Sequence, residues 1–86
     1  MINEKDNPVE WAILIYELDD AREHLETLLK EMSEAGDFTD EDFAASVGHI
    51  FAHLNRAWNT RNVVSEITSE RTDAMSQFPT DLKPVG

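Results

Sequence analysis

Three histidines, His24, His49 and His53, are the side chains of this chain that are best suited to hold a metal ion. His49 and His53 are four residues apart, so they share one face of a helix. If the preceding helix runs antiparallel, His24 comes to the same height, and three imidazoles with one open position suit zinc or another transition metal. The HExxH spacing is absent, however, and histidines at a surface or helix edge are the simpler interpretation. We therefore predict no metal site from the sequence.

Two short acidic motifs offer another kind of metal chemistry. Glu23 and Glu26 form an ExxE motif, and Glu70 and Asp73 form an ExxD motif. The combination resembles the magnesium-binding motifs of all-α nucleoside-triphosphate pyrophosphohydrolases of the MazG type. That resemblance implies a Mg²⁺ ion that carboxylates hold against the phosphates of a nucleotide. Because the expected helix register places Glu23 and Glu26 opposite residues near position 50, where no acid occurs, this activity ranks third among the functions that the sequence allows.

Other arrangements that support catalysis are missing from the sequence. It contains no cysteine and no GxSxG motif, and its 3 glycines are isolated, so neither a nucleophile set nor a phosphate-binding loop is present. Ferritin-like di-metal sites need an ExxH motif, but the residue three positions before each histidine is Ala21, Ser46 or Ile50. We therefore predict that the protein is not an enzyme and that it uses no cofactor.

A long first helix is predicted for residues 8–35. Asn7 stands at the N-cap position, Pro8 at the first helical position, and Glu10 where it can reach back to the cap. Gly36 stands where a left-handed residue ends a helix. Between these signals the apolar residues follow a spacing of alternating three and four, which is typical of a seam between packed helices. They are Trp11, Leu14, Leu18, Ala21, Leu25, Leu28 and Met32.

A second helix is predicted for residues 40–75, and the fold class is therefore all-α. Thr39 is its expected N-cap, and the acids that follow complement the positive end of the helix dipole. Two long helices joined by about four residues form an antiparallel αα-hairpin. We expect residues 1–78 to form one helical-hairpin domain, and residues 79–86, with Pro79 and Pro84 near their start and end, to form an extended tail.

A lone hairpin of this length leaves apolar side chains without cover. Exposed apolar area of this kind usually marks an interface, and a symmetric dimer of hairpins, which is a four-helix bundle, would bury it. The residues expected at this oligomer interface are Trp11, Ile15, Leu29, Phe51 and Trp58.

A polar face of the second helix is the candidate ligand-binding surface. The chain has no acid between Phe43 and Ser65, and within this window His53, Arg56, Asn59 and Asn62 lie near one another on helical spacing. The simpler explanation is that this helix avoids acids because it lies beside the acidic first helix. If a ligand binds, these four residues are where we expect it.

Arg61 falls on the apolar stripe of the second helix, where an unpaired cation is costly. Glu10 and Glu17 lie at its level on the first helix. We predict a structural ion pair between Arg61 and one of these acids, within a chain or between two copies.

The charge balance restricts the possible partners. With 18 acidic residues, 7 lysines and arginines and a net charge of -11, the chain is a poor ligand for nucleic acid or for an anionic membrane. The absence of cysteine and of an apolar leader favours a cytoplasmic protein. The sequence thus predicts a self-associating, non-catalytic interaction or regulatory module. The alternative is an acidic inhibitor or mimic that binds a basic surface of an enzyme or nucleic-acid-binding protein.

Overall fold

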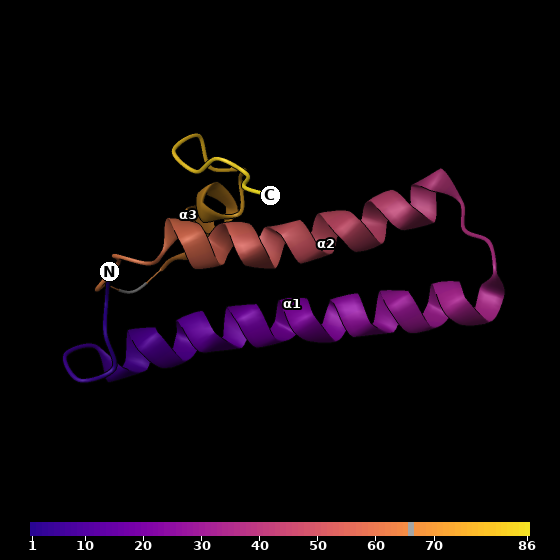
Figure 1. The fold of residues 1–86 in the computed structure, drawn as a ribbon. Coiled ribbons are helices and arrows are strands. Elements are labelled where there is room, and N and C mark those ends of the chain that lie inside the picture. Colours follow the sequence, from indigo (N-terminus) through magenta and orange to yellow (C-terminus); the bar gives the residue numbers. More distant parts are fainter. Residues whose placement is uncertain (66) are drawn as a thin grey trace.

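The computed structural model describes residues 1–65 and 67–86, which form three helices and irregular segments without a strand. They are α1 (Pro8–Ala35), α2 (Asp40–Asn59) and α3 (Ser69–Met75). The two long helices lie side by side and antiparallel, and α3 packs on α2 (Figure 1). The all-α class and the helical hairpin are therefore confirmed.

The ends of α1 follow the signals in the sequence. Pro8 occupies the first turn, and Gly36 ends the helix with a left-handed φ of 74°, while its N–H donates to the carbonyl of Met32 at 3.0 Å. Asn7 is the N-cap residue, but its side chain accepts no hydrogen bond from the helix, so the expected reciprocal cap with Glu10 is not formed. Pro8 removes one of the N–H groups that a cap would satisfy, and the helix starts correctly without it.

The start of α2 was predicted correctly, but its end was not. The Thr39 side chain accepts a hydrogen bond from the N–H of Asp42 at 3.0 Å, which is the expected cap. The helix ends at Asn59 instead of continuing to 75, and the described residues between 60 and 68 are not helical; residue 66 lies outside the described part. This segment is rich in threonine, valine and isoleucine, whose β-branched side chains lose rotamer freedom in a helix.

The third helix was missed because its start signal lies inside the predicted long helix. The Thr68 side chain accepts a hydrogen bond from the N–H of Arg71 at 3.3 Å, and Glu70 stands in the first turn. A threonine cap followed by an acid is an N-terminal signature that marks a new helix here. After α3 the chain turns back along α2, and the C-terminal segment lies on the side of α2 away from α1, whereas the N-terminus lies at the end of the hairpin away from the α1–α2 loop (Figure 1).

The contact between α1 and α2 uses residues seven apart on α1, namely Leu14, Ala21 and Leu28. Ala57 is buried with Leu14, and Ile50 is buried with Ala21 and Leu28. Trp11 and Ile2 close the first of these clusters, and Phe38 and Val47 close the second. Leu18 and Leu25, which belong to the predicted seam of the first helix, are instead exposed, so the helices meet along only part of that seam.

Candidate functional site

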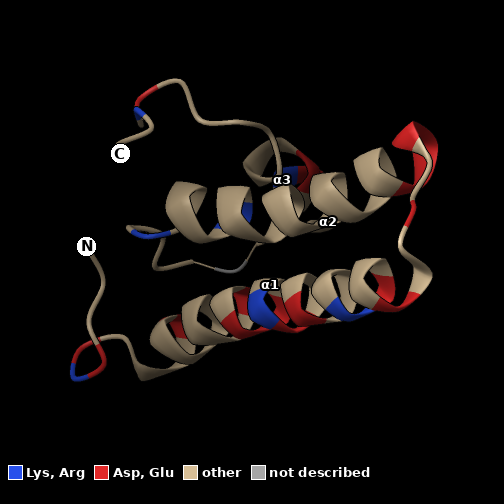
Figure 2. Cartoon of the chain, turned by 45° about the vertical axis from the view of Figure 1, so that its right-hand side comes forward, with Lys and Arg blue, Asp and Glu red and all other residues tan. Residues whose placement is uncertain are grey.

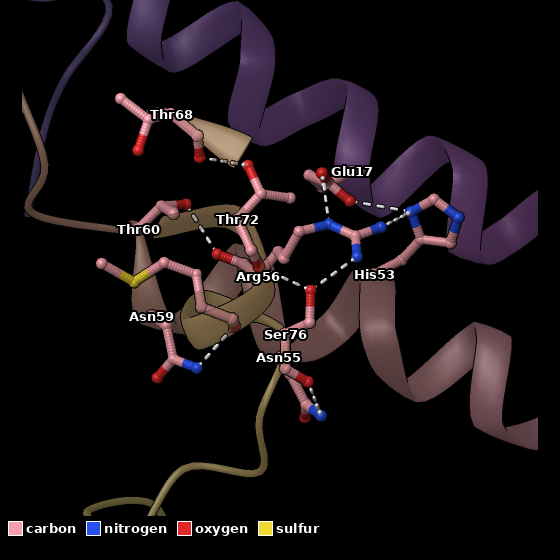
Figure 3. Close-up of polar contacts among 10 residues, drawn as sticks. Glu17, His53, Asn55, Arg56, Asn59, Thr60, Thr68, Thr72 and Ser76 are labelled. Carbon is pink, nitrogen blue, oxygen red and sulfur yellow. Dashed lines mark hydrogen bonds and ion pairs between the residues drawn. The ribbon is translucent and has the colours of Figure 1, made fainter. Parts of the chain in front are cut away.

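A partly buried ion pair joins α1 to α2. Arg56 Nε donates to Glu17 Oε1 at 2.9 Å, and one Arg56 Nη donates to Ser76 Oγ at 2.9 Å, just after α3 (Figure 3). The side chains of Arg56 and Glu17 are 19% and 21% exposed. Arg56 therefore connects all three helical segments, and water screens its charge only in part.

Glu17 also bonds to His53, whose Nδ1 lies 2.7 Å from Glu17 Oε2. An Nη of Arg56 lies 3.0 Å from the same nitrogen, but Nδ1 cannot both donate to the carboxylate and accept from the guanidinium. The shorter contact to an anionic acceptor favours a proton on Nδ1. The Nε2 atom is then the nitrogen with a free lone pair, and it is buried without a hydrogen-bond partner among the described residues.

The three histidines gather at the same level of the hairpin. One ring nitrogen from each of His24, His49 and His53 lies within 4.8 Å of the others. Their ring centroids are 4.0 to 5.2 Å apart, and the His53 ring is stacked with both of the others. His53 is buried, whereas His24 and His49 are exposed. The prediction that His24 lies at the same level of the hairpin as His49 and His53 is therefore confirmed.

The surroundings of His49 oppose its protonation. Partial desolvation lowers the pKa of His49, and the neighbouring His24, His53 and Arg56 lower it further, while Asp20 acts in the opposite direction. A neutral imidazole is the form in which histidine binds a metal.

A cavity of about 490 Å³ adjoins the Glu17–Arg56 pair. Glu17 and Arg56 provide charged groups at its wall, and Glu10 and Thr72 add polar ones. Most of the exposed lining is apolar; its apolar side chains are Val9, Ile13, Val63, Ile67 and Met75. The cavity exists because α2 ends at Asn59 and the chain returns through α3, so the sequence analysis, which continued the helix, could not anticipate it.

Three of the four polar residues at which we expected a ligand make hydrogen bonds within the fold. His53 and Arg56 bond to Glu17, and the side-chain amide of Asn59 donates to the carbonyls of Met75 and Gln77 at 2.7 and 2.9 Å. Asn62 is exposed.

Asn55 was not among the predicted site residues, yet it is 6% exposed and its side chain donates to the Ser76 carbonyl at 2.9 Å. Asn55 and Asn59 are four residues apart and bind the chain that follows α3. An asparagine pair at this spacing near a helix end was the available signal for a returning segment.

Among the described residues, Arg61 forms an ion pair with neither of its two predicted partners, Glu10 and Glu17. Its guanidinium lies 3.7 Å over the Trp58 ring, donates to the Trp58 carbonyl at 2.9 Å and pairs with Asp81 at 3.5 Å. Glu17 is engaged by Arg56 instead. Within the chain, Arg61 contacts the C-terminal segment instead of α1, because α2 ends before Arg61. An ion pair between Arg61 and one of these acids in a second copy remains a prediction.

The two acidic motifs lie on different helices and do not converge. Glu23 and Glu26 are exposed on α1, and Glu70 and Asp73 are exposed on α3, which packs on α2. In the part of the chain that the structure describes, only the histidine cluster brings three or more potential ligand side chains close enough to share a metal ion.

The residues predicted at an oligomer interface divide into two groups. Ile15 and Leu29 are exposed. Trp11 packs into the Ile2–Leu14–Ala57 cluster, Phe51 makes an edge contact with Phe78, and the Trp58 indole N–H donates to Asp81 at 2.9 Å. The two chain ends therefore already cover part of Trp11, Phe51 and Trp58.

The chain matches no protein-family model, and comparison with curated proteins and with solved structures gave no match. Among the described residues, no helix combines the length and apolar character that crossing a bilayer requires.

Proposed function

We propose that this chain is a small, non-catalytic protein-interaction module that pairs with a second copy of itself to form a four-helix bundle. The observation that carries the proposal is the exposure of seven large apolar side chains on one side of the hairpin. We call this face the apolar flank. Its residues are Ile15, Leu18, Leu25 and Leu29 on α1 and Phe43, Phe51 and Leu54 on α2.

Helix geometry places these residues on one side of the α1–α2 contact. Leu18 and Leu25 come four residues after the buried Leu14 and Ala21, and Leu54 comes four residues after the buried Ile50. The polar residues Glu17, His24 and His53 instead come three residues after these same buried positions. Four residues advance a helix by slightly more than a turn and three by slightly less, so the two groups lie on opposite flanks. Antiparallel packing brings the matching flanks of α1 and α2 together.

The amount of apolar surface left uncovered supports association. None of the large side chains in the described part is fully buried, and Leu18 and Leu25 are each 47% exposed. Burying the remaining half of one leucine side chain contributes about 1 kcal/mol. A chain of 86 residues has little other core, so covering this flank would add substantially to its stability.

The distribution of charge supports a second copy as the occupant. Acidic residues are concentrated on α1 and at the start of α2, whereas the rest of α2 is almost free of them (Figure 2). Arg22, which lies between Leu18 and Leu25 in the helical repeat, is paired within α1 to Asp19 at 2.8 Å and to Glu26 at 2.7 Å. The charges nearest Leu18 and Leu25 on α1 are therefore partly compensated within one chain, although each chain carries a net charge of -11.

Leu25→Gln tests this proposal, with Tyr16→Gln as a matched control on the same helix. Tyr16 is also exposed, but it lies nine residues away and so points in the opposite direction. A symmetric dimer loses two leucine contacts, so Leu25→Gln should weaken dimerisation by ~2 kcal/mol, or roughly 30-fold in Kd. Tyr16→Gln should leave Kd unchanged. Equal effects of the two variants in sedimentation equilibrium would contradict the proposal.

Salt separates this function from binding to a basic partner. Apolar burial tolerates salt, whereas exposed charges are screened over about 8 Å at physiological ionic strength. Self-association should therefore persist in 1 M NaCl. Association that disappears in salt would favour the acidic inhibitor or mimic.

A further inference from the structure

We propose that His24, His49 and His53 form a binding site for one divalent transition-metal ion of the zinc type. The site lies on the flank of the hairpin opposite the apolar flank. It is independent of self-association, since each chain provides all three ligands.

The spacing of the three ring nitrogens is close to that of a metal-bound set. Tetrahedral zinc with bonds of ~2.0–2.1 Å holds its nitrogen ligands about 3.3 Å apart. The three nitrogens now lie within 4.8 Å of one another. Shifts of about 1 Å or less toward a common centre would close the site, and His24 and His49 are exposed side chains that can rotate to make them.

His53 is held as a metal ligand before any metal arrives. It is 8% exposed, its Nδ1 is bonded to Glu17, and its Nε2 is buried without a partner in the described part of the chain. A buried nitrogen with an unused lone pair is costly unless something binds it. In metalloproteins a carboxylate commonly accepts the second N–H of a histidine ligand, which orients the ring and raises its basicity. Glu17 occupies this position for His53.

The ligand set selects the class of metal. Three imidazoles suit zinc, copper, nickel or cobalt, while magnesium and calcium prefer oxygen ligands. The Glu17 carboxylate offsets the charge of Arg56, which lies at 2.9 Å from it, so this cation does not oppose a bound metal alone. Solvent reaches His24 and His49, so water completes the fourth position.

The test uses the untagged full chain, because a histidine tag would bind the same metals. Equilibrium dialysis against Zn²⁺ with elemental analysis should show saturable uptake of one ion per chain. Replacing zinc with Co²⁺ should give the visible absorption of a tetrahedral cobalt complex. The double variant His24→Asn, His49→Asn removes two exposed ligands, and its Zn²⁺ affinity should fall by at least about 100-fold while its circular dichroism spectrum is unchanged.

Two further variants make the result specific. Glu34→Gln removes an exposed acid at the far end of α1, and it should bind Zn²⁺ as the parent does. Glu17→Gln keeps all three ligands but loses the carboxylate behind His53, and it should bind about 10–100-fold more weakly. Three results would each overturn the proposal: unchanged affinity in the double-histidine variant, uptake that does not saturate, or half an ion per chain, which would indicate a site shared between copies.

Discussion

The substitution Glu17→Gln tests whether the link between α1 and α2 depends on charge. Glu17 accepts hydrogen bonds from Arg56 at 2.9 Å and from His53 at 2.7 Å, and both of its oxygens are used. Glutamine has one oxygen and one NH₂ group, so one of the two donors would face another donor. Losing one hydrogen bond to a charged, partly buried partner costs ~2 kcal/mol. Urea unfolding followed by circular dichroism at a fixed protein concentration measures this loss in the free energy of unfolding.

The control is Asp19→Asn, which breaks an ion pair of similar length on the surface. Asp19 and Arg22 are joined at 2.8 Å, but their side chains are 46% and 55% exposed. Exposed pairs contribute ~0.5 kcal/mol or less. The reasoning is refuted if the two variants lose the same stability, because burial would then not be what strengthens the Glu17 contacts.

Three further predictions concern helix ends and the tail. Thr39→Ala removes the hydrogen bond to the N–H of Asp42 and should lower the free energy of unfolding by ~1 kcal/mol in urea titrations. Gly36→Ala should lower the free energy of unfolding by about 1 kcal/mol, because Gly36 has a left-handed φ of 74°. Gly48→Ala, in the middle of α2 with open space at its Cβ, should raise the free energy of unfolding by up to ~1 kcal/mol. Thermal unfolding that shifts in the same direction for both variants would contradict this. The hydrogen bond from the Trp58 indole lowers the pKa of Asp81 below its ordinary value of 3.8, so this contact contributes fully above that pH and is lost as the pH falls through the lowered pKa. The indole N–H resonance of Trp58 should report this transition, and it should do so in the parent but not in Asp81→Asn.

The sequence allowed α1 and the start of α2 to be predicted because their signals are local. Pro8, Gly36 and Thr39 act within one helical turn, and the structure uses each at the expected position. The end of α2 depends on a balance between weak helix propensity after Asn59 and the contacts that α3 makes when it returns. Those contacts are long-range, and the local signals for them, the Thr68 cap and the Asn55–Asn59 pair, do not say where the returning segment packs.

The candidate site was predictable in its outline but not in its pairing. The positions of His24, His49 and His53 follow from helix periodicity and the hairpin register. The partner of Glu17 does not, because a long arginine side chain can reach an acid from more than one turn; the sequence indicated Arg61, and the structure uses Arg56. Likewise, the burial of His53 Nε2 without a hydrogen-bond partner depends on side-chain packing, which the sequence pattern does not indicate.

The mass in solution across a dilution series tests the proposed self-association most directly. Sedimentation equilibrium should give twice the 9.8 kDa of one chain at high protein concentration, with reversible dissociation on dilution and little dependence on salt. A mass of 9.8 kDa at every concentration, with α1 and α2 still folded by circular dichroism, would contradict the account, because the apolar flank would then be stable in contact with water.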